Sequence, residues 1–275
     1  MKAIDLSAAL LLGVASAGAA AELDDAAKER FLREARLVRV RDAGGGITGS
    51  QRATLSLDGA VHDAHVQTID ETEAMAVLDD GPPELDFRDS YLGNVAAYRL
   101  DRLLGLGMVP VSVVRVFRGR SAAFTWWVDD VQMDERERSK KDVQPPSASR
   151  WAAEVGAVRV FDQLIYNTDP NPGNQLIDRD WRIWMIDQSR AFKIFKTLDS
   201  RDKLGRRCAR QLLDALRRLD RAALKEKTGD VLSGGQVEAL LARRDQIVSH
   251  FDARVAELGE AVVLYDLPPR DEAGK

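Results

Sequence analysis

Oxygen-bearing side chains concentrate in one stretch of the sequence, "YNTDPNPGNQLID" at residues 166–178. Within it Asp169 stands five residues before Asn174, and Asp187 follows at the end of an apolar run, "IWMID". Phosphoryl transfer uses these residue types, because a carboxylate orients or deprotonates the acceptor hydroxyl while oxygen ligands hold Mg²⁺ against the phosphates. The spacing therefore predicts one site, with Asp169 as the catalytic residue and Asn174 and Asp187 as metal ligands.

Two other interpretations of this stretch are open on residue types alone. An EF-hand calcium loop needs glycine at its sixth position and Glu at its twelfth, whereas here Gly173 is fifth and Asp180 is twelfth. The register therefore argues against calcium. The second alternative is a proline-stiffened turn in which Asp and Asn side chains only cap the backbone.

Helices and strands on both sides must position these residues. An amphipathic helix is expected from about Ser149 to Tyr166, directly before the loop, and a hairpin joins "NQLI" to "WRIWMID" behind it. Upstream, short strands follow the glycines of "GGGITGSQRATLSLDG", and "SYLGNVAAYRLDRLLGLG" has helical spacing that ends at Gly105. A strand pair is expected in "VPVSVVRVFRG" and "SAAFTWWVDD".

The segment "VFDQLIYNTDPNPGNQLIDRDWRIWMIDQSRAF" resembles the catalytic segment of the atypical protein-kinase-like superfamily, which includes phosphatidylinositol-kinase-like, HipA-type and secretory-pathway kinases. With the upstream motifs the resemblance covers about residues 44–195. The sequence is similar in particular to exported bacterial kinase-like proteins of undefined substrate. The resemblance implies an α+β, bilobal kinase-like fold with a small β-rich N-lobe and a helical C-lobe. It also implies Mg²⁺ and ATP, or another nucleotide, as cofactors.

The resemblance implies roles for further residues. Trp127 and Val128 would form the hinge whose backbone meets adenine, and the glycine turn containing Gly46 and Gly49 would cover the phosphates. Together with composition and pattern along the chain, this gives the expected organisation: a signal peptide over 1–21, a helix over 22–41, an N-lobe over 42–131, an exposed connection or insertion over 132–148, a C-lobe over 149–260 and a tail over 261–275.

The sequence departs from the family pattern at the phosphate-binding ion pair. Gln67 stands in "AHVQTIDE" where the family has Lys, and Asn94 stands in "SYLGNVAAYRLD" where it has the partner Glu. Losing only one member would leave a buried unpaired charge that costs about 3–5 kcal/mol, whereas a neutral Gln and Asn can hydrogen-bond each other. Lys193 or Lys196 could replace the cation, although a surface position is the simpler interpretation of both.

Composition limits the other possible functions. The formal charge is -4, from 40 Lys and Arg against 44 Asp and Glu, so no overall positive field favours nucleic acid. Cys208 is the one cysteine, and only three histidines are present, which argues against zinc sites built from these residues. We therefore expect a nucleotide and an unknown acceptor or protein partner, and no nucleic acid.

The N-terminus carries a small apolar run, "LSAALLLGVASAGAAA", that closes with Ala19-Ala20-Ala21. Its length and its small-residue end are typical of a secretory signal peptide, and Asp5 offsets the positive charge of Lys2. We expect export to the periplasm or outside the cell, with no membrane span after cleavage. If the run is instead an alanine-rich helix, the protein is cytoplasmic.

Three hypotheses follow. The first is a weak or rewired kinase that keeps Asp169, Asn174 and Asp187 but lacks the Lys–Glu pair at Gln67 and Asn94. The alternative is a catalytically inactive pseudokinase that acts as an exported binding module. The third, a purely structural protein, would make the spacing of the three residues a coincidence.

Overall fold

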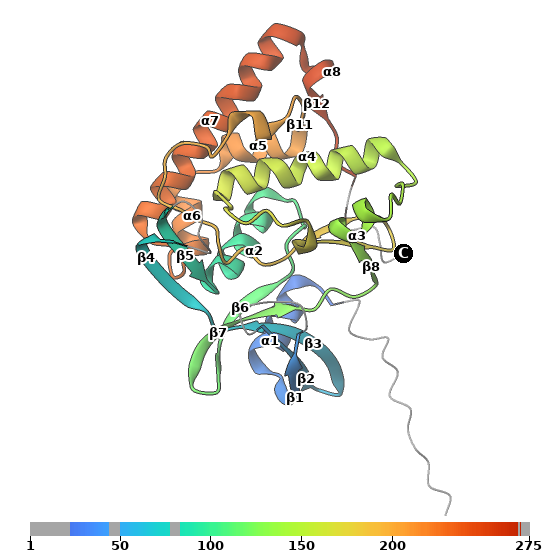
Figure 1. Ribbon diagram of the computed structural model, residues 1–275, viewed down its shortest axis with the longest axis vertical. Coiled ribbons are helices and arrows are strands. Elements are labelled where there is room, and N and C mark those ends of the chain that lie inside the picture. Colours follow the sequence, from blue (N-terminus) through green and yellow to red (C-terminus); the bar gives the residue numbers. More distant parts are fainter. Residues whose placement is uncertain (1–22, 44–49, 78–82, 269, 271–275) are drawn as a thin grey trace, which may run out of the picture.

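A computed structural model describes residues 23–43, 50–77, 83–268 and 270. The predicted signal peptide, Gly46 and Gly49 lie outside the described residues. Across the described ranges, no helix is long and apolar enough to cross a membrane. The chain forms two parts, a β-rich N-terminal lobe and a helical C-terminal lobe, as Figure 1 shows.

The N-terminal lobe is built on a five-stranded antiparallel sheet in the order β1-β2-β3-β7-β6. One face packs against two helices, and side chains on that face of β2, β3 and β7 are buried. The elements are α1 (Asp25–Glu34), α2 (Leu92–Leu104), β1 (Arg36–Asp42), β2 (Gln51–Leu57), β3 (Ala60–Gln67), β6 (Ser112–Phe117) and β7 (Arg120–Trp126).

The helix predicted over 22–41 is shorter than expected. Asp24 caps α1 through the amide of Ala27, and the helix ends at Glu34 because Ala35 takes an extended conformation. The next residues, "RLVRVRD", form β1 instead, which pairs with β2 in antiparallel register. Valine favours strands, and pairing with β2 outweighs the charged helical pattern read from the sequence.

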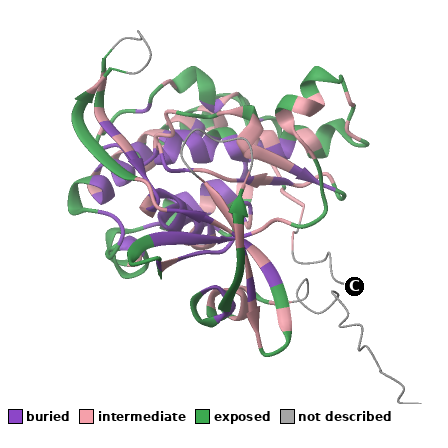
Figure 2. Cartoon of the chain, turned by 60° about the horizontal axis from the view of Figure 1, so that its bottom comes forward, coloured by how far each residue is buried: buried purple, intermediate pink, exposed green. Residues whose placement is uncertain are grey.

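A long hairpin is inserted between β3 and α2. Its strands are β4 (Asp70–Ala76) and β5 (Glu84–Ser90), which form a two-stranded sheet of their own. Strand β4 is exposed almost throughout, whereas the end of β5 is buried, as the colours of Figure 2 show.

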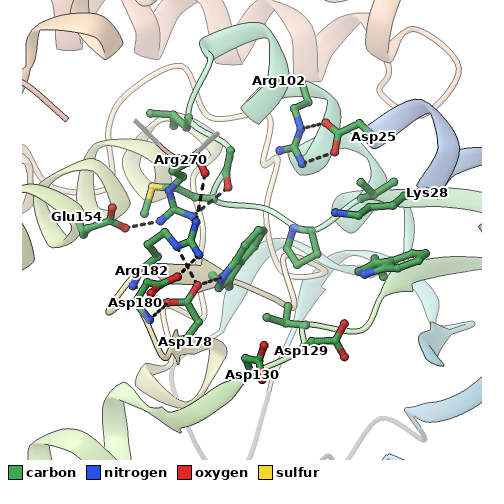
Figure 3. A pocket seen from close by; sticks show the side chains of 18 of the residues that line it. Asp25, Lys28, Arg102, Asp129, Asp130, Glu154, Asp178, Asp180, Arg182 and Arg270 are labelled. Carbon is green, nitrogen blue, oxygen red and sulfur yellow. Dashed lines mark hydrogen bonds and ion pairs between the residues drawn. The ribbon is translucent and has the colours of Figure 1, made fainter. Parts of the chain in front are cut away.

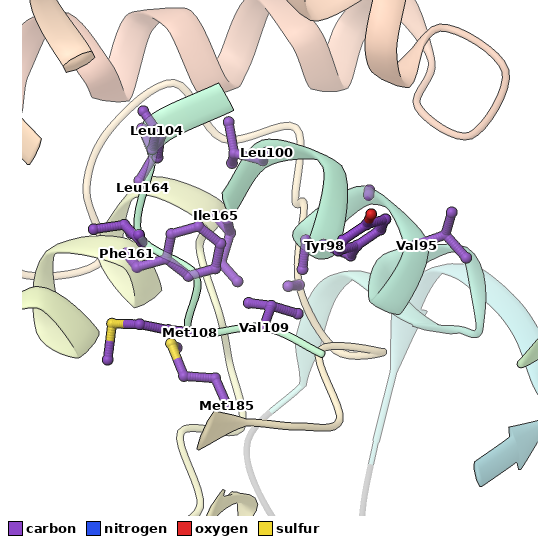
Figure 4. Close-up of a cluster of buried hydrophobic side chains, with 14 of the residues drawn as sticks. Val95, Tyr98, Leu100, Leu104, Met108, Val109, Phe161, Leu164, Ile165 and Met185 are labelled. Carbon is purple, nitrogen blue, oxygen red and sulfur yellow. The ribbon is translucent and has the colours of Figure 1, made fainter. Parts of the chain in front are cut away.

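The C-terminal lobe surrounds helix α4 (Ala148–Ile165). Ser147 caps its first turn, and nearly all residues of its last two turns are buried. The other helices are α5 (Arg210–Arg218), α6 (Arg221–Thr228) and α7 (Gly234–Leu258), with two 3-10 turns, η1 (Pro172–Asn174) and η2 (Arg201–Leu204). Side chains of α2, α4 and the segment after Gly105 meet in a buried apolar cluster (Figure 4).

The predicted exposed connection over 132–148 is partly ordered into regular structure. Strand β8 (Val131–Asp134) pairs with β9 (Gln175–Asp178), which pairs with β10 (Ile183–Met185), and helix α3 (Glu135–Lys140) follows β8. Its residues are exposed or half-buried throughout, and Asp134 caps α3 within it.

The predicted tail over 261–275 also begins with regular structure. Helix α8 (Glu260–Val263) leads into β12 (Leu264–Tyr265), which pairs in parallel with β11 (Cys208–Ala209). The Tyr265 hydroxyl donates to the carbonyl of Ala153 on α4 at 2.9 Å. This contact fixes Tyr265 against α4, so the predicted tail packs against the lobe at its start.

Candidate functional site

The loop after α4 presents Asp169 at the surface. Tyr166 ends the helix in the left-handed region, at φ 52°. The Asp169 amide then donates to Oδ1 of Asn167 at 3.0 Å, and the Gly173 amide donates to Oδ1 of Asn171 at 2.9 Å. Side-chain oxygens thus do stiffen the backbone, as the turn interpretation expected, while the Asp169 side chain remains exposed.

The hairpin of β9 and β10 brings Asn174 beside Asp187. The amide of Ile186 donates to the carbonyl of Asn174 at 2.9 Å, so the two predicted metal ligands lie on adjacent segments. Asp187 adopts φ 59°, a conformation that non-glycine residues rarely take and that is often found at functional sites. Among the described contacts, none joins the Asp169 carboxylate to either residue.

A chain of amide hydrogen bonds stands in place of the family's ion pair. Asn94 on α2 donates through Nδ2 to Oε1 of Gln67 on β3 at 2.5 Å, and Gln67 donates through Nε2 to Oδ1 of Asp187 at 3.3 Å. The Asn94 Oδ1 accepts from the Gln188 amide at 2.7 Å. Gln67 and Asn94 are both buried. Their side-chain amides hydrogen-bond each other, as the sequence predicted.

Close packing holds this network together. A Cβ atom on Gly93 would lie 2.3 Å from the carbonyl oxygen of Gln188. Only glycine therefore allows the start of α2 to approach the segment after Asp187. The backbone amide of Ser90 also donates to the carbonyl of Ser189, at 3.0 Å.

The sheet face above the site is polar near the predicted hinge. Arg52 stacks on Trp127, with its guanidinium 3.9 Å from the ring centroid, and its Nε donates to the Asp63 carboxylate at 2.5 Å. The Trp127 amide donates to the Asp63 carbonyl at 3.2 Å. His65 lies between Asp63 and Gln67 on the same strand face, where burial lowers its pKa and the charge of Asp187 opposes that shift.

Lys193 is neither a surface residue nor a free cation. Its side chain is fully buried, and Nζ bonds to Oε1 of Glu84 at 2.7 Å and to the carbonyl of Asp86. Glu84 also pairs with Arg190 and accepts from the Thr168 hydroxyl at 3.3 Å. Lys193, one of the two replacement cations that the sequence offered, is thus paired with Glu84 of the inserted hairpin. Lys196, the other, is exposed.

Asp89 is a residue near the site that sequence analysis missed. It is 7% exposed, and its Oδ1 is buried without a hydrogen-bond partner in the described structure. Burial raises the pKa of Asp89, the Ser189 hydroxyl opposes the shift, and the negative charge of Asp187 adds to it. No feature of "ELDFRDS" distinguishes this aspartate from Asp86, so only the fold could identify it.

Across residues 23–43, 50–77, 83–268 and 270, no three His, Cys, Asp or Glu side chains gather closely enough to hold a metal ion. A divalent cation at Asp187 would therefore need the amide oxygen of Asn174, water or phosphate oxygens as well. Such oxygen donors suit Mg²⁺, which keeps several waters and is usually bound by one or two carboxylates together with substrate phosphates.

A cavity with a volume of about 1680 Å³ lies elsewhere in the described structure. It adjoins the hinge at Val128 and contains ion pairs of Arg102 with Asp25, Arg182 with Asp178, and Arg270 with Glu154, drawn in Figure 3. Gln67, Asn94, Asn174 and Asp187 do not line it. The predicted hinge residue Val128 thus contributes to a cavity outside the predicted metal site.

Comparison with solved structures identifies the fold. A structure of hydra Fam20 with sugar has a TM-score of 0.65 at 14% identity, covering 86% of this chain and 90% of that chain. The Golgi casein kinase with Mn and ADP bound has a TM-score of 0.63 at 14% identity, covering 90% of this chain and 81% of that chain. The chain therefore has a protein-kinase-like fold.

The kinase-like fold predicted from the sequence, bilobal and of the α+β class, is thus confirmed. No protein-family model and no curated protein matches the chain. In the kinase-like fold, Gln67 and Asn94 occupy the strand and helix that face Asp187 from the N-terminal lobe.

Proposed function

We propose that the protein is a metal-dependent, kinase-like phosphotransferase with an altered phosphate anchor. Asp169 orients or deprotonates the acceptor hydroxyl, and Asn174 and Asp187 would hold Mg²⁺ or Mn²⁺. A bound divalent cation neutralises charge on the nucleotide phosphates. The observation that carries this proposal is the 3.3 Å hydrogen bond from Gln67 to Asp187, which places the residue at the family's lysine position against a predicted metal ligand.

The donor set fits a hard cation. Asp187 has one oxygen engaged by Gln67, the adjacent Asn174 has an amide oxygen, and the buried Oδ1 of Asp89 has no donor within the described residues. One structure similar to this chain carries Mn and ADP. A nucleotide and a divalent cation are therefore the ligands that we assign to this site.

Turnover should be slow, because Gln67 is neutral. The loss of a charged group that stabilises the transition state typically costs about 2.7–4 kcal/mol, or about 10²–10³ in rate. Lys193 does not compensate, since its ammonium is already bonded to Glu84.

A pseudokinase is the second candidate, and two observations favour it. Both polar ends of the Gln67 side chain are engaged, by Asn94 and by Asp187, which leaves only the second amide hydrogen for a phosphate. The sheet face near Trp127, where the resemblance places adenine, also carries the Arg52–Asp63 ion pair. A purine ring bound there would contact a polar surface. Such a protein would bind a partner without turnover.

Thermal unfolding with and without Mn²⁺-ATP or Mg²⁺-ATP separates these functions, together with a hydrolysis assay and Asp187→Asn as the blank. A ligand that binds only the folded state raises the unfolding temperature by mass action. Stabilisation with turnover, both lost in Asp187→Asn, supports the phosphotransferase. Stabilisation without turnover supports a nucleotide-binding pseudokinase, and no response at millimolar nucleotide refutes the nucleotide site.

We also propose that the protein is exported, because of the apolar run that ends at Ala19-Ala20-Ala21. Mass spectrometry of the native protein tests this, and an intact Met1 terminus in a cytoplasmic fraction would refute it. Bacterial compartments outside the cytoplasm contain little ATP, so an exported enzyme would need another phosphate donor.

A further inference from the structure

Asp89 has a buried carboxylate oxygen for which the described structure provides no donor. Its side chain is 7% exposed, and no salt bridge to it occurs among the described residues. A buried charged oxygen without a partner is costly, and native proteins rarely contain one without a structural or functional reason. Asp89 therefore requires an explanation.

Helix capping does not explain Asp89. Helix α2 begins at Leu92, and its N-cap residue, Tyr91, makes no side-chain cap. Pairing within the hairpin does not explain it either. The cross-strand partner of Asp89 is Glu71, another carboxylate, whereas the neighbouring pair is satisfied because the Ser90 hydroxyl donates to Asp70 at 2.6 Å.

Strand β5 directs Asp89 toward the segment that carries Asp187. Alternate residues share one face of a strand, so Asp89 shares a face with Phe87. The Phe87 ring packs against Arg190, whose guanidinium carbon lies 4.8 Å from the ring centroid. The Ser90 amide donates to the carbonyl of Ser189, so the backbone beside Asp89 contacts the chain two residues beyond Asp187.

We propose that Asp89 is a further cation ligand, which binds the same divalent metal as Asp187 and Asn174. This inference rests on the proposed function. It explains the buried Oδ1, because a hard cation such as Mg²⁺ or Mn²⁺ satisfies a carboxylate oxygen that has no protein donor. It also restores one carboxylate to a site in which Asn94 replaces the glutamate of the family.

The charges support this assignment. Two carboxylates, Asp89 and Asp187, balance one divalent cation, whereas Asp187 alone does not. Since the nucleotide phosphates have no lysine at position 67, a more firmly held cation would be their main positive partner. The chemical class of the ligand is thus a hard divalent cation that binds in the absence of nucleotide.

The test measures Mn²⁺ binding to the full chain without nucleotide, by the electron paramagnetic resonance of free Mn²⁺ during titration. The variants are Asp89→Asn and Asp187→Asn, and Glu71→Gln is the matched control. Glu71 lies directly opposite Asp89 on β4 and is exposed, so its variant removes the same charge without removing the proposed ligand. Asp89→Glu tests rescue by a conservative change.

We expect Asp89→Asn and Asp187→Asn each to weaken the affinity for Mn²⁺ at least about tenfold. Glu71→Gln should change this affinity by less than about threefold, since exposed charges are screened. Thermal unfolding shows whether each variant folds, so that a loss of Mn²⁺ binding is not mistaken for a folding defect. Mn²⁺ should raise the unfolding temperature of the wild type and Glu71→Gln, but not that of Asp89→Asn.

If Asp187→Asn loses the ion while Asp89→Asn binds it like the wild type, the role of Asp89 is refuted and the proposed function survives. If the wild type has no saturable Mn²⁺ site without nucleotide, the role of Asp89 is refuted, and the response to Mn²⁺-ATP decides the proposed function separately.

Discussion

Restoring the missing ion pair is the most informative perturbation of this protein. In the double variant Gln67→Lys with Asn94→Glu, charged groups replace the two amides that hydrogen-bond at 2.5 Å. Asn94→Glu alone places a second carboxylate beside Asp187 and removes the donor to Gln67 Oε1. Because Asn94 is 4% exposed, this buried unpaired charge should cost about 3–5 kcal/mol of unfolding free energy.

Gln67→Lys alone should be less harmful. Its ammonium replaces an amide that lies 3.3 Å from Asp187 Oδ1, so a carboxylate partner already exists. The change leaves Asn94 Nδ2 without its acceptor, which should cost about 1–3 kcal/mol. In the double variant the two new charges face each other, and we expect a favourable coupling energy of about 2–3 kcal/mol.

Urea unfolding of the four proteins measures this coupling, and calorimetry with Mg²⁺-ATP measures its functional effect. Gln144→Lys is the control, because Gln144 is exposed and the same substitution there should change stability by less than about 0.5 kcal/mol. The double variant should bind nucleotide more tightly and raise turnover by about 10²–10³. If the stability effects of the two single changes simply add up in the double variant, the side chains at positions 67 and 94 do not interact. An active wild type that the double variant does not improve would place the phosphate anchor elsewhere.

Three further outcomes follow from the packing around the site. Gly93→Ala should cost about 1–3 kcal/mol and weaken Mn²⁺ binding, because its Cβ would displace the Gln188 carbonyl 2.3 Å away; unchanged stability in urea would contradict this contact. Lys193→Met should cost about 3–5 kcal/mol by leaving Glu84 partly unpaired, and the double change with Glu84→Gln should recover part of that loss in the same assay. Burial raises the pKa of Asp162 to about 6, so the folded state binds this proton more tightly and stability should fall as pH rises from about 4 to 6. Asp162→Asn should remove up to about 3 kcal/mol of that fall, and parallel pH profiles of the two proteins would refute the shift.

Local patterns predicted the hairpin that brings Asn174 beside Asp187. The five-residue spacing of Asp169 and Asn174, and the hairpin that leads to Asp187, depend on short-range turn and strand chemistry. The interaction of Gln67 with Asn94 followed from the cost of a single buried charge. These inferences need only the neighbouring residues or one pair of positions.

The remainder depends on partners distant in sequence. Lys193 was interpreted as a surface residue because lysine is rarely buried without a partner, and its partner, Glu84, is 109 residues away. Asp89 was missed for the same reason, since its environment is created where the hairpin meets the segment after Asp187. Residues 36–41 were predicted as helix because their pairing with β2 is not visible in their own sequence.

The inserted hairpin changes how the two lobes are held together. In kinases that have the Lys–Glu pair, nucleotide phosphates help to link the lobes through the lysine. Here Glu84 on the hairpin contacts Lys193 and Thr168 of the other lobe, and the Ser90 amide contacts Ser189. Because the Lys193 side chain is fully buried, separating the lobes on this side would break its ion pair with Glu84. The lobes are therefore coupled without nucleotide, and a ligand at Asp187 should enter a largely formed site and cause little lobe rotation.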